Sequence, residues 1–190
     1  MVPDPAALRR RLQSAGATTG FRGLMVDRRY DRDGALFALD HVLRLRELVA
    51  HGGESEYTVS WKGPTGVTPE GYKSRTELEY QLRPLRASPG ELFERLGYQE
   101  VMRIERYVEY YRLAGAEVRI EWYPRMDVLV ELEGEPEAIE AALPRLAIPR
   151  EAWLADPLPL FAARYAERTG IAAALTREDL GGGVPSWESA

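Results

Sequence analysis

Two pairs of glutamates, each separated by one residue, could bind a metal ion: Glu77 with Glu79, and Glu131 with Glu133. In a β-strand, alternate residues share a face about 6.5 to 7 Å apart, so each pair could offer two carboxylates to one divalent cation. Hard oxygen ligands suit Mg²⁺ or Mn²⁺, and zinc is not expected in a chain with no cysteine and two histidines. A single Glu-x-Glu pair is weak evidence, because it also occurs on many solvated faces.

Basic residues in the predicted strands could bind phosphate oxygens, because guanidinium groups bind such oxygens in pairs and lysine acts as a point charge. The candidates are Arg44, Arg46, Lys62, Arg75 and Arg103. Phosphoryl and nucleotidyl transfer depend chiefly on positioning and charge neutralisation, so they need metal-binding carboxylates and phosphate-binding cations together. The combination indicates this chemistry more strongly than either set alone.

The same alternation also fits a purely structural interpretation. A sheet with one face on helices and the other in water carries Lys, Arg and Glu that pair across strands for little net energy. On the pattern alone this interpretation is favoured. The alternative is a sheet that curls into a barrel and turns the charges inward, where an anionic ligand would offset the desolvation of the arginines.

The composition limits the class of protein. The chain has 190 residues, of which 45% are hydrophobic and 29% charged, as in a folded domain rather than a disordered or membrane-spanning chain. A net charge of −5 argues against binding to duplex nucleic acid. No signal peptide or membrane span is found, and a cytoplasmic location is expected. The common nucleotide-binding loops and the nucleophile elbow are absent, so any triphosphate chemistry must come from side chains.

Four helices are expected from capping residues and periodicity, over residues 4–16, 88–97, 136–144 and 159–170, with a turn around Trp153. The second has the best signals, because Ser88 and Glu91 form a capping box pattern. The run Arg9 to Arg11 is interpreted as a solvated helix face. We expect one domain over residues 1–175 and a flexible C-terminal tail over residues 176–190, which is rich in glycine.

Six strands are expected from a period of two, and they predict an α+β protein with a mostly antiparallel sheet. In one of them Glu117, Arg119 and Glu121 alternate with apolar residues. The expected strands are 42–46, 57–62, 73–82, 101–111, 117–123 and 127–133.

Seven segments occur in an order that resembles the CYTH family, also called triphosphate tunnel metalloenzymes. The resemblance covers roughly residues 5 to 168, and it is greatest to class IV adenylyl cyclases, with thiamine triphosphatases and inorganic triphosphatases as relatives. The segments are Tyr30-Asp31, Val42 to Arg46, Trp61 to Pro64, Lys73 to Glu79, Val101 to Arg103, Ile120-Glu121 and Val130 to Gly134.

The resemblance implies a closed antiparallel β-barrel, or tunnel, with peripheral helices. It also implies that the tunnel binds a triphosphate compound together with Mg²⁺ or Mn²⁺. Lys62 and Arg103 would then take part in catalysis. The phosphate-binding residues implied are Arg44, Arg46, Lys62, Arg75, Arg103 and either Arg164 or Arg168. The metal ligands implied are Glu77, Glu79, Glu121, Glu131 and Glu133.

Two features depart from the family pattern. The family's opening strand carries Glu-x-Glu-x-Lys before the first helix, and that signature has no counterpart here. Glu105 stands where relatives carry a second basic residue, for which Arg106 could compensate through a bulge.

The resemblance implies one of two enzymes: an adenylyl cyclase making cyclic AMP and pyrophosphate, or a hydrolase of thiamine triphosphate or inorganic triphosphate. The alternative is a non-catalytic nucleotide or polyphosphate binding protein.

The expected partners follow from the same resemblance. The ligand would be a triphosphate-containing small molecule such as ATP, thiamine triphosphate or inorganic triphosphate. Nucleic acid and membrane partners are not expected, and a homodimer is one possible assembly.

Overall fold

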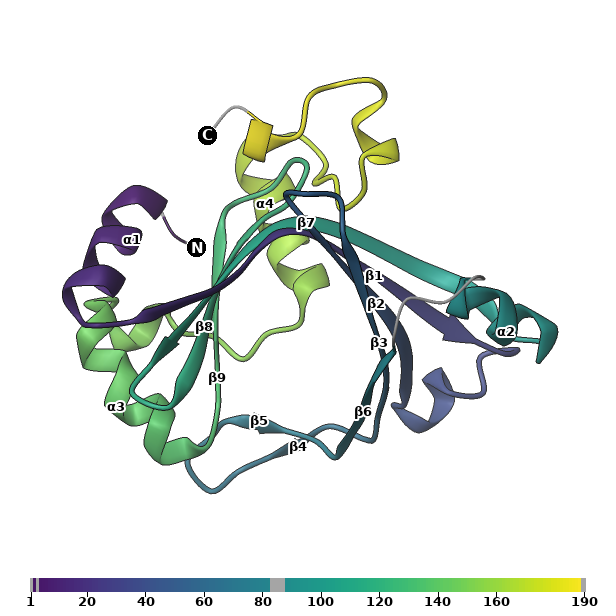
Figure 1. Cartoon of the computed structure of the whole chain (residues 1–190), viewed down its shortest axis with the longest axis horizontal. Helices are drawn as coiled ribbons and strands as arrows, with labels where there is room; N and C mark the ends of the chain where they lie inside the picture. The colour runs from purple at the N-terminus through teal and green to yellow at the C-terminus, as the bar shows by residue number, and fades with distance from the viewer. Residues whose placement is uncertain (1, 3, 83–87, 189–190) are drawn as a thin grey trace. The chain divides into compact units, whose positions relative to one another are not determined.

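The computed structural model describes residues 2, 4–82 and 88–188, and the chain divides into two compact units. The middle unit comprises residues 23–105, and the terminal unit comprises residues 1–22 and 106–190. Two long strands, β1 (Thr18–Asp31) and β7 (Gln99–Leu113), contribute residues to both units (Figure 1).

The middle unit is built on antiparallel strands with the hydrogen-bonded order β6-β3-β2-β1. They are β1, β2 (Val42–Ala50), β3 (Ser55–Lys62) and β6 (Glu77–Leu82). Two short strands, β4 (Gly66–Val67) and β5 (Lys73–Ser74), pair with each other. Helix α2 (Pro89–Arg95) belongs to the same unit.

Tyr30 on β1 contacts helix α2 closely. Its ring meets Phe93 edge to face with the centroids 5.0 Å apart, and only 3% of Tyr30 is exposed. A β carbon built at Gly90 would lie 2.5 Å from the Tyr30 hydroxyl oxygen. Glycine therefore allows the helix to approach this strand.

The terminal unit packs helices on one face of the strands β7, β8 (Ala116–Trp122) and β9 (Leu129–Glu133), which are antiparallel neighbours in that order. These helices are α1 (Pro5–Ser14) and α3 (Pro136–Leu146). A third helix of the unit, α4 (Leu158–Thr169), contributes none of its described residues to their core. The core includes Leu12 from α1, Val118 and Ile120 from β8, and Leu146 from α3. Because neighbours along a strand face opposite ways, residues 117, 119 and 121 lie on the other face of β8.

The expected helices are confirmed. Asp4 caps α1 by accepting a hydrogen bond of 2.8 Å from the Ala7 amide, and proline stands at the first helical position. At α2 the Ser88 hydroxyl accepts from the Gly90 amide at 3.3 Å. Helix α3 runs two residues beyond the expected end, through Pro144, and ends where Ala147 adopts a left-handed conformation.

The interpretation of Arg9 as part of a solvated face is wrong. Its guanidinium donates two hydrogen bonds to the Glu109 carboxylate, at 2.9 and 3.0 Å, and lies 5.0 Å from the ring centroid of Trp122. Glu109 is 3% exposed, so this pair is part of the packing between α1 and the strands.

Two details of the expected strands differ in the structure. Strand β1 was not expected, because Met25, Val26 and Asp27 are all buried and the period of two disappears where both faces are covered. The expected strand 73–82 is two strands, β5 and β6. They separate where the carbonyl of Thr76 accepts a hydrogen bond of 2.8 Å from the Gly63 amide.

The α+β class and the antiparallel sheet are confirmed. The hydrogen-bonded order ends at β6 and at β9, and among the described residues no strand pairing joins these two strands. The closed tunnel stays a prediction, as does the single domain over residues 1–175. None of the helices in the described part of the chain has the length and apolar character needed to cross a membrane.

The last described residues make contacts within the terminal unit. The Ser186 amide donates to the carbonyl of Pro124 at 2.9 Å, its hydroxyl donates to the carbonyl of Tyr123 at 2.7 Å, and Trp187 packs against the core. Flexibility of the tail over residues 176–190 stays a prediction.

Candidate functional site

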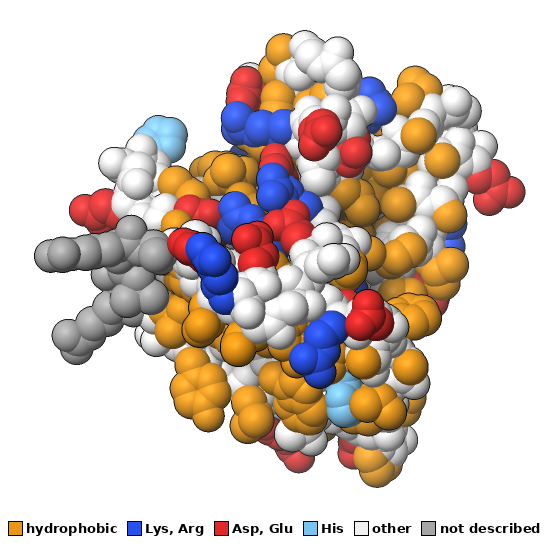
Figure 2. Space-filling model, turned by 90° about the vertical axis from the view of Figure 1, so that its right-hand side faces the viewer, with side chains coloured by type: hydrophobic (Ala, Val, Ile, Leu, Met, Phe, Trp, Pro, Cys, Tyr) orange, Lys and Arg blue, Asp and Glu red, His pale blue; other side chains and the backbone are white. Residues whose placement is uncertain are grey.

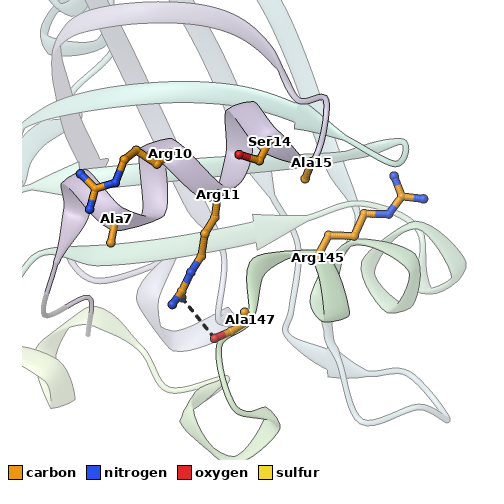
Figure 3. Close-up of a pocket in the computed structure, with 7 residues that line it drawn as sticks. All are labelled: Ala7, Arg10, Arg11, Ser14, Ala15, Arg145 and Ala147. Atoms are coloured by element: carbon orange, nitrogen blue, oxygen red, sulfur yellow. Dashed lines mark hydrogen bonds between the residues drawn. The ribbon is translucent and has the colours of Figure 1, made fainter.

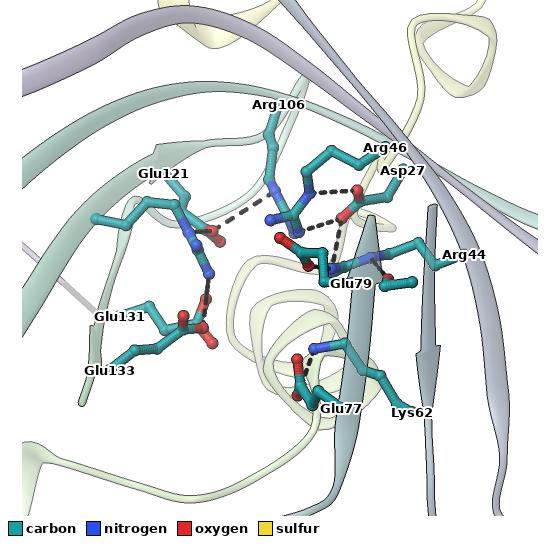
Figure 4. Close-up of polar contacts among 12 residues, drawn as sticks. Asp27, Arg44, Arg46, Lys62, Glu77, Glu79, Arg106, Glu121, Glu131 and Glu133 are labelled. Atoms are coloured by element: carbon teal, nitrogen blue, oxygen red, sulfur yellow. Dashed lines mark hydrogen bonds and ion pairs between the residues drawn. The ribbon is translucent and has the colours of Figure 1, made fainter. Parts of the chain in front are cut away.

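Basic and acidic side chains line one face of the sheet in the middle unit. The register places Asp27 opposite Arg46, and Ser60 opposite both Arg44 and Glu79. Directly opposed residues in an antiparallel pair point to the same face, so these side chains form one row across four strands. We call this set the arginine row; its members are Asp27, Arg44, Arg46, Ser60, Lys62, Glu77 and Glu79 (Figure 4).

Asp27 holds the two arginines of the row in place. Arg46 donates to both carboxylate oxygens of Asp27, at 2.7 and 2.8 Å, and the nearest nitrogen of Arg44 lies 3.9 Å from the same carboxylate. Arg44 also donates to the Ser60 hydroxyl at 3.0 Å. Asp27 is 4% exposed and Arg44 8%, so the two guanidinium groups have fixed positions in a largely buried environment.

The predicted acids of the middle unit bind basic residues of the same row. Lys62 donates to Glu77 at 2.6 Å, and Arg44 lies 3.4 Å from a carboxylate oxygen of Glu79. Both glutamates are about half exposed, so these ion pairs are accessible to solvent.

Arg75 and Arg103 lie elsewhere in the middle unit. Arg75 donates to the backbone carbonyl and the carboxylate of Asp40, at 3.0 and 3.1 Å. Backbone hydrogen bonding from Thr65, supported by the charge of Arg75, lowers the pKa of Asp40. The structure therefore places Arg75 against a loop rather than beside Arg44 and Arg46.

Arg103 belongs to a different cluster. It donates to both oxygens of Glu100, at 2.8 and 3.1 Å, and this hydrogen bonding raises the pKa of the arginine. Glu100 also lies 3.8 Å from Arg28, which follows Asp27 along β1 and so points to the opposite face. The structure joins Arg103 to Arg28 and not to the arginine row.

Carboxylates from β8 and β9 in the terminal unit converge on one arginine, Arg119. Its Nε donates to Glu121 at 2.7 Å, one terminal nitrogen donates to Glu131 and to Glu133 (3.0 Å), and the other donates to Glu117 at 3.4 Å. The Tyr110 hydroxyl accepts a further hydrogen bond of 3.3 Å. Arg119 is 4% exposed, whereas the side chains of Glu131 and Glu133 are about half exposed, so a buried guanidinium compensates carboxylates that reach solvent. Figure 4 shows Glu121, Glu131 and Glu133 of this group.

Two further groups bind Glu121 at this cluster. The Tyr123 hydroxyl donates to Glu121 at 2.5 Å, and Arg106 lies 3.5 Å from the same carboxylate. Burial and then the negative charge of Glu121 raise the pKa of Tyr123 well above its ordinary value. Arg106 thus lies beside the same glutamate that binds Arg119, and its compensation for Glu105 stays a prediction.

The electrostatics of the cluster follow from burial and from Arg119. Burial opposes the charge of Arg119, but the carboxylates of Glu131, Glu121 and Glu133 outweigh it and raise the arginine's pKa well above its ordinary value. Burial opposes ionisation of Glu131 as well, and Arg119 more than offsets it, so the pKa of Glu131 is lowered. At Glu133 burial and the neighbouring carboxylate prevail, and the pKa is raised.

Both candidate arginines on α4 form exposed ion pairs. Arg164 donates to Asp156 and Arg168 donates to Asp127, each at 2.6 Å, and both arginine side chains are about half exposed. The structure gives no reason to prefer one of them as the phosphate-binding residue of the helix.

A pocket between α1 and α3 is separate from all of these residues (Figure 3). Arg11 crosses it and donates to the carbonyl of Ala147 at 3.3 Å, where α3 ends. The lining residues are Ala7, Arg10, Arg11, Ser14, Ala15, Arg145 and Ala147. None of them belongs to the predicted site.

Carboxylate oxygens are the right ligands for Mg²⁺ or Mn²⁺, but their arrangement here does not fit a divalent cation. Among the residues that the structure describes, no group of three or more His, Cys, Asp or Glu could hold a metal ion. Each of the five predicted ligands binds Lys62, Arg44 or Arg119 instead. Figure 2 likewise shows Lys and Arg side chains next to Asp and Glu side chains on the surface it presents.

Sequence reasoning missed the two residues that organise the clusters. Asp27 lies in the strand that was not expected, and the only signal was an acid directly after the apolar Met25 and Val26. Arg119 was recognised on a polar face, but its role depends on its pairing opposite Glu131, a register that the sequence does not show.

Comparisons with known proteins bear on the fold. No family model matches the chain, and no curated protein matches it. The PH1819 protein of Pyrococcus horikoshii superposes with a TM-score of 0.64 at 19% identity, over 83% of this chain and 92% of that one. The PH1012 protein of the same organism gives 0.61 at 16%, over 81% and 91%. A Vibrio parahaemolyticus protein described as a "putative adenylate cyclase" gives 0.65 at 13%, over 85% and 93%. The chain therefore shares the fold of these proteins.

Proposed function

We propose that this chain binds a triphosphate-containing small molecule and acts on it as an adenylyl cyclase or as a triphosphate hydrolase. The cyclase would convert ATP to cyclic AMP and pyrophosphate, and the hydrolase would act on thiamine triphosphate or inorganic triphosphate. The CYTH-like fold and its similarity to the Vibrio protein support this class of function.

The observation that carries the proposal is the fixed pair Arg44 and Arg46. Two guanidinium groups lie on neighbouring positions of one sheet face, both close to the single carboxylate of Asp27. Side chains ordered in this way lose little further freedom when they bind. A polyphosphate offers several anionic oxygens in a row, which paired guanidinium groups recognise with good geometry.

The same residues would favour the reaction. Charge shifts onto phosphate oxygens in the transition state, and cations already in position stabilise it without reorganisation. In the cyclase the ribose 3′ hydroxyl attacks the α-phosphorus and pyrophosphate leaves. In the hydrolase water attacks the terminal phosphorus. Of the two basic residues that the resemblance assigns to catalysis, Lys62 lies in the arginine row, whereas Arg103 binds Glu100 outside it, so the proposal gives the catalytic role to Lys62.

The ligand would bind inside a tunnel like that of the CYTH family. Mg²⁺ or Mn²⁺ is included as the cofactor that the resemblance implies. Since the arrangement of the carboxylates does not fit a divalent cation, no step of the reaction is assigned to it.

Turnover assays on Arg46→Gln test the proposal. ATP, thiamine triphosphate and inorganic triphosphate are incubated with the full chain in Mg²⁺, Mn²⁺ or EDTA, and cyclic AMP, pyrophosphate and phosphate are separated. We expect turnover by the unaltered chain and a loss of about tenfold or more in the variant, because one charge-assisted bond contributes roughly 1.5 to 3 kcal/mol. Arg9→Gln is the matched control, because it breaks a similar two-bond pair with a buried acid.

Equal activity in Arg46→Gln and in the unaltered chain would contradict the role of the arginine row. Absence of any product from all three substrates would contradict the enzymatic part of the proposal.

A second candidate function is non-catalytic binding of a nucleotide or polyphosphate. It is favoured by the ion pairs that already bind every predicted metal ligand. Titration calorimetry with inorganic triphosphate distinguishes it from the enzyme: tight binding that Arg46→Gln weakens, with no product in the assays above, supports a binding protein. A sheet face with a purely structural role predicts no binding at all.

A further inference from the structure

Every N–H group of the Arg119 guanidinium donates a hydrogen bond. The group carries five N–H bonds, and the five acceptors come from three adjacent strands. They are Tyr110 on β7, Glu117 and Glu121 on β8, and Glu131 and Glu133 on β9. The ring of Tyr110 also lies 5.2 Å from the guanidinium carbon. The position of this cation is thus determined from several directions.

The guanidinium stands where the carboxylates converge. Glu131 and Glu133 lie on alternate positions of β9, and Arg119 pairs directly opposite Glu131. Both carboxylates accept hydrogen bonds from the same terminal nitrogen of the arginine, while Glu121 accepts one from its Nε. A metal ion needs such oxygens about 2.0 to 2.6 Å from one common centre. That centre is filled by a side chain.

We propose that Arg119 is the resident cation of this carboxylate cluster and excludes divalent cations from it in the free protein. The inference deepens the proposed function, on which it rests for treating these glutamates as the metal ligands that the resemblance implies. The exclusion itself follows only from contacts within the terminal unit.

Displacing Arg119 would be unfavourable. A metal ion entering the cluster would have to break most of the five hydrogen bonds and leave a guanidinium, now 4% exposed, without its acceptors. Removing the guanidinium has the opposite effect. Four glutamates then remain together and repel one another, and a divalent cation relieves that repulsion.

Mn²⁺ binding to Arg119→Met tests the proposal without any substrate. Methionine keeps much of the volume of the arginine stem but provides no charge. Free Mn²⁺ is measured by electron paramagnetic resonance with the full chain, and thermal unfolding is followed with and without Mn²⁺. We expect the variant to bind Mn²⁺ about tenfold or more tightly than the unaltered chain, and Mn²⁺ to raise the melting temperature of the variant alone.

Two controls assign the effect to the cluster. Arg9→Met also exposes a buried carboxylate, but only that of Glu109, so we expect no gain in Mn²⁺ binding. Adding Glu131→Gln and Glu133→Gln to Arg119→Met should abolish the gain. Should Arg119→Met fail to fold, Arg119→Gln is measured in its place, because glutamine removes the charge and keeps an amide that can still donate hydrogen bonds. We expect it to bind Mn²⁺ more tightly than the unaltered chain.

Tight Mn²⁺ binding by the unaltered chain, lost in Glu131→Gln, would overturn the inference. A folded Arg119 variant that binds Mn²⁺ no more tightly than the unaltered chain would overturn it as well. Calorimetry of inorganic triphosphate binding in EDTA tests the proposed function separately, because it measures binding of the ligand to the arginine row in the absence of divalent cations.

Discussion

Acidic side chains position the backbone as well as the arginines of this protein. Asp31 ends β1, and its carboxylate accepts hydrogen bonds from the backbone amides of Leu36 (3.0 Å), Phe37 (3.0 Å) and Arg32 (2.6 Å). These bonds, that of Leu36 foremost, lower the pKa of Asp31. They fix the turn that leads from β1 to β2, which carries Arg44 and Arg46.

Because the Asp31 carboxylate holds this turn, we expect the free energy of unfolding to depend on pH in the acidic range. A carboxyl with a lower pKa in the folded state adds stability above its unfolded pKa of about 3.9, and the stability is lost as the pH falls through the folded value. We expect Asp31→Asn to lower the urea midpoint at pH 6, and the difference from the unaltered chain to shrink below about pH 4. Urea unfolding of both proteins between pH 2.5 and 6 measures this difference in midpoint. A difference that does not change over this range would show that ionisation is not involved.

The sequence predicted residue positions better than residue partners. The alternation of Arg44 and Arg46 with apolar neighbours placed both on one face correctly, since side-chain direction along a strand is a local property. It did not show that Arg103 binds Glu100 or that Arg119 binds four glutamates. Such partners depend on strand register and on twist, which bring together residues far apart in the chain.

Elements whose ends are marked by local chemistry were predicted well. Proline and a capping residue begin α1, and a residue with positive φ follows it at Gly16. Strand β1 was missed, because burial on both faces removes the alternation on which prediction depends. Where local signals failed, the reason was tertiary packing.

The packing of α1 gives a prediction at this scale. Leu12 has no exposed surface and belongs to the core that α1 forms with the strands and α3. We expect Leu12→Ala to lower the free energy of unfolding by about 2 to 5 kcal/mol, because it removes buried methyl groups and leaves a cavity. Denaturant unfolding measures the loss. Arg10→Ala on the exposed side of the same helix is the control, and an equal effect of both changes would contradict the assignment of the buried face.

The whole molecule is organised as two compact units, and the chain begins and ends in the terminal one. Its last described residues return to the segment after β8, where Ser186 binds the carbonyls of Pro124 and Tyr123. Tyr123 in turn donates to Glu121 of the acidic cluster. The C-terminal residues therefore contact the backbone of a residue that belongs to the candidate site.

Deleting residues 176–190 tests whether these contacts stabilise the protein. The deletion removes Ser186 and the partly buried Trp187, so we expect a melting temperature several degrees lower, since a loss of 1 kcal/mol corresponds to about 2 to 4 °C at this size. Trp187→Ala should reproduce most of the loss, and Val184→Ala, at an exposed side chain, very little. An unchanged melting temperature would support the flexible tail that the sequence predicts.

The contact between Gly90 and Tyr30 also has a consequence for evolution. Tyr30 is packed against Phe93 and has little room to move, so a β carbon at position 90 would meet its hydroxyl oxygen. While α2 keeps its place, a side chain at position 90 therefore requires a change at position 30. Among natural variants of this chain, those with a larger residue at position 90 should carry a smaller one at position 30, and the covariation would record the docking of the helix.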